Sequence, residues 1–183
     1  MKTALLIIDV QNDYFPNGKM ELNNSTDAAS KIKDLINHFR NRSMPIIHVQ
    51  HISTRPGSTF FLPGTSGAEF HGDVKPIAGE KIIVKNFPNS FRKTQLNDYL
   101  KENNISKLVI TGMMTHMCID TTVRAAFDLG YECMVVGDCC ATKTLTFNNK
   151  EVAAESVQNS FLAALNGVFS RVLKKDEAIE LMK

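Results

Sequence analysis

Three side chains with complementary chemistry stand near the ends of short apolar runs in the sequence. Asp9 lies at the end of TALLIIDV, Lys85 at the end of KIIVK, and Cys118 shortly after LVIT. A helix start and a neighbouring cation both favour a cysteine thiolate, and a carboxylate can take and return a proton. These residue types therefore predict an activated sulfur nucleophile, provided that the fold brings them together.

The apolar runs are typical of strands, and the stretches between them are typical of helices. The unbroken apolarity of Thr3–Val10 indicates a strand buried on both faces, as in a parallel sheet. We expect further strands at 46–52, 81–85, 107–111, 132–137 and 168–173. We expect helices from 25 or 26 to about 42, from 94 to 103, from the turn at Gly112 through Cys118 to Leu129, and over 151–165 and 176–181.

This alternation predicts an α/β fold with helices on both faces of the sheet. Right-handed crossovers favour a three-layer, doubly wound arrangement around a six-stranded, mostly parallel sheet. The carboxyl ends of parallel strands share one edge, so Asp9, Lys85 and Cys118 can converge there. Ser53–Glu80 is long and rich in Gly, Pro and Ser, which is typical of a lid or binding loop, and 138–150 is expected to be a polar loop.

Each of the three residues also has an ordinary structural interpretation. Asp9 can bond loop N–H groups at a strand end, Lys85 can be the solvated end of a short strand, and Cys118 can be a small buried apolar residue. The residues alone leave these alternatives open.

Length and charge narrow the class of protein. A chain of 183 residues predicts one domain, over 1–183. The 21 Lys and Arg against 19 Asp and Glu give a net charge of +2 without a basic stripe, so no nucleic-acid partner is expected. The run ALLII is too short for a signal peptide or a membrane span. The four cysteines have neither disulfide nor zinc spacing. We therefore expect a cytoplasmic protein without membrane association.

Three ordered motifs carry a resemblance to a known family. DVQND from Asp9, KN followed after four residues by Phe91, and GMMTHMC ending at Cys118 resemble the signature segments of isochorismatase-like cysteine hydrolases, a group that includes nicotinamidases and N-carbamoylsarcosine amidases. The similarity covers nearly the whole chain. It implies a six-stranded parallel sheet and an Asp–Lys–Cys triad at Asp9, Lys85 and Cys118.

The resemblance also implies a mechanism. A cis peptide bond is expected at Met113–Met114, and the backbone N–H groups of Met114 and Cys118 would form an oxyanion hole. The implied reaction is hydrolysis of an amide-type C–N bond of a small molecule through a Cys118 thioester, without a cofactor. Expected substrate-binding residues are Gln11, Phe15, His51, Arg55, Phe87, Phe91, Thr115 and His116.

The sequence departs from nicotinamidases after the second expected strand. Those enzymes carry an Asp-x-His metal cluster there, whereas this chain reads HVQHIS. His48 and His51 are three residues apart on a strand and so point to opposite faces. No metal site is expected.

Two other functions and an assembly state follow from the remaining features. Cys139–Cys140 with Cys118 suggests a redox-responsive protein, and a catalytically idle member could bind a small molecule or a partner. The helix 151–165 is apolar on more than one side, which predicts a homo-oligomer, a dimer or larger, unless the closing helix 176–181 covers it.

Overall fold

The computed structural model describes residues 2–182. Its main sheet has the order β3-β2-β1-β4-β5-β8, and every neighbouring pair of strands is parallel. These strands are β1 (Lys2–Ile8), β2 (Ile46–His51), β3 (Lys81–Lys85), β4 (Ile105–Met113), β5 (Glu132–Ala141) and β8 (Arg171–Leu173). The chain winds outwards from β1 to β3, crosses to β4, and winds to the other edge. The predicted six-stranded, doubly wound sheet is thereby confirmed.

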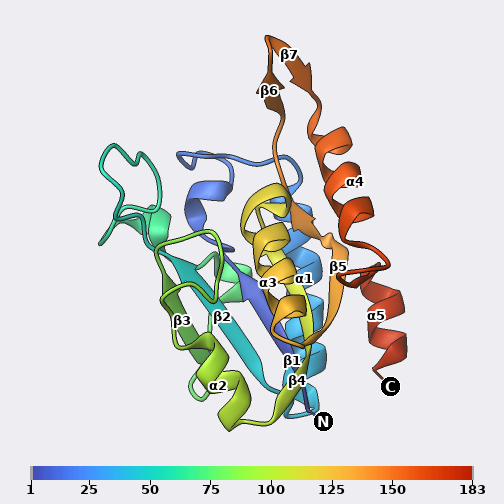
Figure 1. Cartoon of the computed structure of the whole chain (residues 1–183). Coiled ribbons are helices and arrows are strands. Elements are labelled where there is room, and N and C mark those ends of the chain that lie inside the picture. The colour runs from blue at the N-terminus through green and yellow to red at the C-terminus, as the bar shows by residue number, and fades with distance from the viewer. Residues whose placement is uncertain (1, 183) are drawn as a thin grey trace.

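Helices cover both faces of this sheet (Figure 1). One face packs against α1 (Ser25–Asn41) and α5 (Lys175–Leu181), and the other against α2 (Leu96–Glu102), α3 (Asp120–Asp128) and α4 (Ala154–Leu165). Alternate residues of β1 divide between the two layers, Leu5 and Ile7 facing α1 and Leu6 and Ile8 facing the opposite layer. Burial on both faces explains why β1 is continuously apolar.

Gly112 allows β4 to run further than the sequence suggested. The prediction ended this strand at Thr111 and placed a turn at Gly112, but β4 continues to Met113. Gly112 has φ 123°, and a Cβ there would lie 2.0 Å from the carbonyl oxygen of Ile8. Only glycine lets β4 pass this close to β1. A π-helical turn, η4 (Thr115–Ile119), then leads into α3.

The predicted polar loop over 138–150 is wrong. β5 extends to Ala141 because Gly112 and Met113 of β4 pair with Cys140 and Ala141 after an irregularity in the ladder. A β-hairpin follows, formed by β6 (Leu145–Phe147) and β7 (Lys150–Val152), and it projects from the body of the molecule (Figure 1). Its turn residues Asn148 and Asn149 both have positive φ, as tight hairpin turns require. Accordingly α4 begins at Ala154 rather than 151.

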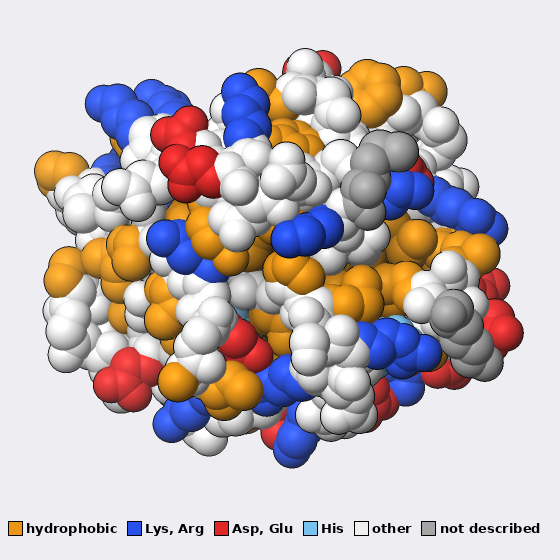
Figure 2. All heavy atoms as spheres, turned by 90° about the horizontal axis from the view of Figure 1, so that it is seen from below, with side chains coloured by type: hydrophobic (Ala, Val, Ile, Leu, Met, Phe, Trp, Pro, Cys, Tyr) orange, Lys and Arg blue, Asp and Glu red, His pale blue; other side chains and the backbone are white. Residues whose placement is uncertain are grey.

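The expected long loop between β2 and β3 contains three-residue 3-10 turns, η2 (Ser66–Ala68) and η3 (Gly72–Val74), but no longer helix. A third such turn, η1 (Asn12–Tyr14), follows β1. On the face shown in Figure 2, acidic and basic side chains are interspersed among apolar ones, in keeping with the near-neutral composition. Within residues 2–182 no helix has the length and apolarity needed to cross a bilayer.

Candidate active site

The predicted chemistry lies where the winding direction of the sheet reverses. β1 and β4 are neighbours, yet the chain leaves them towards opposite edges, and such a switch point is where ligands bind in open α/β sheets. Asp9 follows β1 directly, and Cys118 lies in η4, which follows β4. Lys85 ends β3, two strands away from β1, so its long side chain must reach across the end of β2.

Asp9 and Lys85 form a buried ion pair. Lys85 Nζ lies 2.8 Å from Asp9 Oδ2, and both side chains are 0% exposed. Lys85 Nζ also donates a hydrogen bond of 2.7 Å to the carbonyl oxygen of Pro88. The solvated strand end that was one interpretation of Lys85 is therefore wrong. Cys118 is 5% exposed, and a carboxylate oxygen of Asp9, a ring nitrogen of His51 and Cys118 Sγ all lie within 4.8 Å of one another.

Backbone contacts fix these groups. Asp9 has φ 54°, a left-handed conformation that aspartate tolerates better than most residues, and its N–H donates to Val49 O at 3.0 Å. The peptide bond Met113–Met114 is cis, at the position that the family resemblance indicated. The carbonyl oxygen of Met114 accepts from Met117 N at 3.1 Å and from Ile119 N at 3.2 Å, and these two bonds hold the turn that carries Cys118.

Burial keeps Cys118 protonated at rest. It raises the pKa of the thiol strongly, the carboxylate of Asp9 raises it further, and the ammonium of Lys85 opposes both only in part. Burial also lowers the pKa of Lys85, but the nearby Asp9 and Cys118 outweigh it and the net pKa is raised. A helix start and a lysine therefore do not suffice for the resting thiolate that the sequence suggested. The thiol needs a base, and Asp9 is in place for that.

His51 approaches the same point from the end of β2. Its backbone is clamped by the side chain of Gln11, which accepts from His51 N at 2.7 Å and donates to His51 O at 2.9 Å. Gln11 also donates to Ala68 O at 2.8 Å. The side chain of Gln11 thus joins the ends of β1 and β2 to η2, and its predicted contact with substrate stays a prediction. Burial lowers the pKa of His51; Asp9 partly offsets this, and Lys85 adds to it.

An aromatic cluster that the sequence reasoning missed lies beside His51. The ring centroids of Tyr14 and Phe61 are 4.6 Å apart, those of Phe60 and Phe61 5.0 Å, and those of His51 and Phe61 5.9 Å. Burial raises the pKa of Tyr14 well above its usual range, with Cys118 the next cause, which places Tyr14 near the thiol. Phe60 and Phe61 come from a stretch without periodicity, whereas Tyr14 directly follows the DVQND motif.

Asp13, the last residue of that motif, anchors this aromatic cluster. Its Oδ2 accepts from Phe61 N at 2.6 Å and its Oδ1 from Lys19 N at 3.3 Å. The bond fixes the backbone of Phe61, whose φ is 54°. Asp13 therefore ties the long loop to the turn that follows Asp9.

The other predicted substrate-binding aromatics contact protein groups. The ring of Phe15 stacks on His71 at 3.7 Å, and the guanidinium of Arg92 lies 3.9 Å from the ring centroid of Phe87. Phe91 stacks on Tyr131, which precedes β5 at the amino edge of the sheet, with centroids 6.0 Å apart. These contacts give Phe15 and Phe91 packing roles, and substrate contact stays a prediction for all three.

The polar members of the predicted set differ in exposure. Arg55 is exposed on the loop after β2. Thr115 is buried and its hydroxyl donates to Gln158 Oε1 at 2.6 Å, with Ala141 O at 3.2 Å as a second acceptor near the same proton. His116 Nδ1 lies 2.5 Å from Thr142 Oγ1. Thr115 and His116 thus link the turn before Cys118 to α4 and the end of β5.

The side chains of His48 and His51 lie on opposite faces of the sheet, as the two-residue period of a strand predicted. His48 is buried and its Nε2 lies 2.9 Å from Glu80 Oε2, whereas His51 faces Asp9 and Cys118. Among residues 2–182, Asp9, His51 and Cys118 are the one group of acid, His and Cys side chains close enough to surround a cation. The ammonium of Lys85 already supplies the positive charge beside Asp9.

The arrangement of the cysteines disfavours the redox alternative. All four are free and buried. Cys139 packs with the α1 layer and Cys140 with the opposite layer, so their side chains point to opposite faces of β5. Burial is the largest cause of the raised pKa of both thiols.

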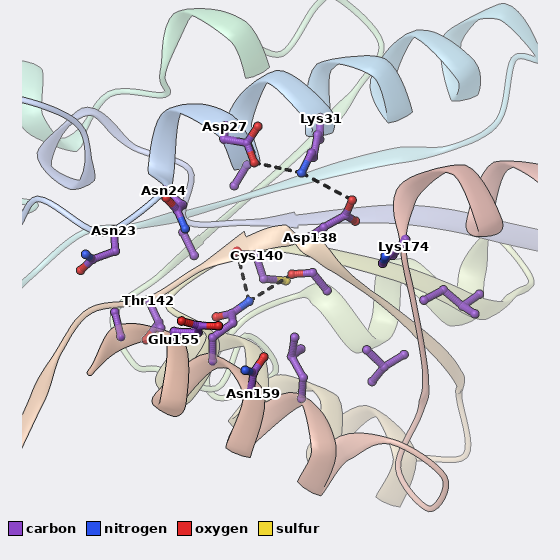
Figure 3. A pocket seen from close by; sticks show the side chains of 18 of the residues that line it. Asn23, Asn24, Asp27, Lys31, Asp138, Cys140, Thr142, Glu155, Asn159 and Lys174 are labelled. Atoms are coloured by element: carbon purple, nitrogen blue, oxygen red, sulfur yellow. Dashed lines mark hydrogen bonds and ion pairs between the residues drawn. The ribbon is translucent and has the colours of Figure 1, made fainter. Parts of the chain in front are cut away.

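A separate cavity of about 720 Å³ lies between α1, β5, α4 and α5 (Figure 3). The side chain of Lys31 lines one wall of this cavity. Its Nζ lies 2.9 Å from Asp27 Oδ2 and 3.6 Å from Asp138 Oδ2. Asp9, Lys85 and Cys118 are not among its lining residues. Gln158 connects the two regions, because it donates to Cys140 O at 3.2 Å and accepts from Thr115.

The fold and the site define a class of protein: a three-layer α/β domain whose parallel sheet holds an acid, an ammonium and a thiol beyond its carboxyl ends. The Isochorismatase domain family matches residues 3–167. The chain therefore belongs to the isochorismatase family of hydrolases, which confirms the resemblance drawn from its motifs.

Individual relatives agree with this assignment. The isochorismatase family protein YddQ of Bacillus subtilis is 54% identical over 172 residues, or 94% of this chain and 96% of that protein. A nicotinamidase of Escherichia coli is 28% identical over 174 residues, or 75% of this chain and 82% of that enzyme. The crystal structure of an isochorismatase hydrolase homologue from Oleispira antarctica is 45% identical, with a TM-score of 0.94 over 98% of this chain and 96% of that chain.

Proposed function

We propose that this protein is a cysteine amidase that cleaves a C–N bond of a small amide. The observation that supports this most is the buried Asp9–Lys85 ion pair at 2.8 Å, next to a buried cysteine at the switch point of the sheet. A purely structural role for this group is disfavoured, because a buried ion pair contributes little to stability relative to apolar side chains of similar volume. The similarity to a nicotinamidase supports an amide as the substrate.

The first half of the reaction forms a thioester. Asp9 takes the proton of Cys118, and the sulfur attacks the carbonyl carbon of the amide. The negative charge passes to the carbonyl oxygen, which is stabilised by the N–H groups of Met114 and Cys118. Asp9 then gives its proton to the amide nitrogen as the C–N bond breaks, and ammonia or an amine leaves. The Lys85 ammonium pairs with the Asp9 carboxylate at the start of each cycle.

The second half releases the product. A water molecule loses a proton to a base and attacks the thioester carbonyl carbon. The C–S bond breaks, the acid product leaves, and the sulfur regains a proton. In sum, one amide and one water give one acid and one amine, and the enzyme is unchanged. Such a cycle uses only the side chains and backbone groups of this chain.

An ammonia-release screen tests the proposal. Purified protein is incubated with nicotinamide, other small primary amides, ureido acids and cyclic amides, and Cys118→Ala is the blank. We expect at least one amide to release ammonia with the wild type and none above background with the variant. Ammonia release by a folded Cys118→Ala or Cys118→Ser protein at the wild-type rate would refute the nucleophile.

A further inference from the structure

The ring of His51, predicted from the sequence to bind substrate, lies beside Asp9 and Cys118, where a second base could act. It ends β2, between Asp9 on the β1 side and Lys85, with which it pairs in register, on the β3 side. Within residues 2–182 neither of its ring nitrogens has a hydrogen-bond partner in the protein, although both of its backbone polar groups are bonded to Gln11. The main chain of His51 is therefore held in place while the ring stays available.

The spacing of the groups fits one water molecule. A ring nitrogen of His51, a carboxylate oxygen of Asp9 and Cys118 Sγ lie within 4.8 Å of one another. Two atoms that share one water through hydrogen bonds of about 2.8 Å lie roughly 4.6 Å apart. A water bonded to His51 can therefore stand beside an acyl group on Cys118.

Asp9 is a poor choice for activating this water. Its carboxylate is neutralised by the Lys85 ammonium at 2.8 Å, and the first half of the reaction already uses it to carry a proton from sulfur to nitrogen. One oxygen of this carboxylate is therefore occupied by Lys85 while the thioester is hydrolysed. A neutral imidazole has no such partner. We propose that His51 is the general base that activates the water in the hydrolysis of the thioester, an inference that rests on the proposed function of Cys118.

The step balances with His51 as the base. A ring nitrogen takes one proton from water as the oxygen bonds to the thioester carbonyl carbon. When the C–S bond breaks, the sulfur leaves with the electron pair and takes that proton from the imidazolium. The titratable groups around the ring are Asp9, Lys85 and Cys118. Tyr14 packs on the neighbouring ring of Phe61. Burial lowers the pKa of His51, which keeps the ring neutral and able to act at neutral pH.

The ester p-nitrophenyl acetate lets formation and hydrolysis of the thioester be measured separately. Release of p-nitrophenolate in the first turnover reports acetylation of the enzyme, and the steady rate that follows reports hydrolysis of the acetyl-enzyme. With His51→Gln we expect one equivalent of p-nitrophenolate followed by turnover at least about 100-fold slower than wild type. Intact mass should show an acetyl group retained on the variant, and the fall of the wild-type hydrolysis rate in acid should vanish. Added imidazole should restore turnover to His51→Ala. His38→Gln on α1, a matched histidine away from the site, should behave as wild type.

The outcomes distinguish this inference from the proposed function. Wild-type turnover by His51→Gln, without retained acetyl, would overturn the role of His51 and leave Asp9 as the base in both halves. No acetylation of either protein at Cys118 would instead overturn Cys118 as the nucleophile. Loss of acetylation in His51→Gln alone would also contradict the inference, because it would place His51 in the first half.

Discussion

At the scale of single residues, burial decides what Cys118 requires. A thiol this far from water resists losing its proton. In the proposed mechanism the adjacent carboxylate of Asp9 is therefore the base that removes this proton. The ammonium of Lys85 then has two effects. It offsets part of the free-energy cost of burying the Asp9 carboxylate, and it limits the rise in the pKa of the Cys118 thiol.

The Asp9–Lys85 pair should show the coupling of two buried charges. Lys85→Met leaves a buried carboxylate without its cation, and removing one partner of such a pair costs about 3–5 kcal/mol. We expect Lys85→Met and Asp9→Asn each to lower the free energy of urea unfolding and to abolish hydrolysis. The double variant should lose clearly less stability than the sum of the two. Strict additivity would show that the two charges do not interact.

Gln11 offers a second test at this scale. Because its amide bonds both backbone groups of His51, Gln11→Ala should loosen the end of β2 and reduce kcat more than it raises KM. Gln50→Ala, which removes a single bond to Ala68 O, is the control. An increase in KM alone would instead support the substrate-binding role first predicted for Gln11.

At the scale of elements, Glu80 fastens the long loop to the sheet and to α1. Its carboxylate accepts from Arg40 Nε at 2.7 Å and Ile77 N at 3.0 Å, and it lies 2.9 Å from His48 Nε2. Burial alone would raise the pKa of Glu80, but Arg40, the Ile77 N–H and His48 outweigh it and lower the pKa below its ordinary 4.5. This carboxylate therefore stabilises the fold fully above pH 4.5, and its contribution is lost as the pH falls through the lower folded value.

Urea unfolding at a series of pH values checks this contribution. Stability should begin to fall below pH 6.5, because burial lowers the pKa of His48 and the unfolded chain then binds the extra proton. A second fall should follow below pH 4.5, and Glu80→Gln should remove it. Glu69→Gln, an exposed residue of the same loop, should leave the profile unchanged. If the stability of Glu80→Gln fell below pH 4.5 as steeply as that of the wild type, Glu80 would not be the carboxylate that stabilises the fold there.

Much of the fold was predictable because buried parallel strands are continuously apolar. β1, β2 and β3 were placed almost to the residue, and with them Asp9 and Lys85. β4 and β5 run longer than predicted because a glycine without a Cβ and a ladder irregularity extend their pairing, and neither leaves an apolar pattern. The hairpin β6–β7 is polar and exposed, so it resembled a loop. Its Asn148–Asn149 turn was the available signal.

The residues of the candidate site could likewise be predicted only in part. Residues at strand ends could be placed from topology, whereas Tyr14, Phe60 and Phe61 meet His51 only through the path of an irregular loop. That path is set by long-range bonds, such as the one from Phe61 N to Asp13 Oδ2, and no local period encodes it.

At the scale of the whole molecule, α4 keeps small apolar side chains on its surface, because Ala163 and Ala164 are exposed. The alternative that the closing helix covers α4 is wrong, because α5 packs against β5 and α1 on the other face. The projecting hairpin carries Phe147, which is 74% exposed. These features favour the predicted homo-oligomer, a dimer or larger.

Light scattering coupled to gel filtration measures the assembly. We expect a mass of at least twice 20.4 kDa, and a shift towards the monomer in Phe147→Ser. Thr146→Ser on the same hairpin is the matched control. A wild-type monomer across a wide concentration range would rule out the oligomer.

Detection of an acyl group on Cys118 during turnover tests the proposed nucleophile most directly. Wild-type protein is mixed with the amide that releases ammonia fastest, quenched in acid within the first turnovers, and measured as intact mass and as peptides. We predict one added acyl group on the peptide that carries Cys118, absent from Cys118→Ala. An acyl group on Cys133, Cys139 or Cys140, or continued ammonia release by Cys118→Ala, would contradict Cys118 as the nucleophile.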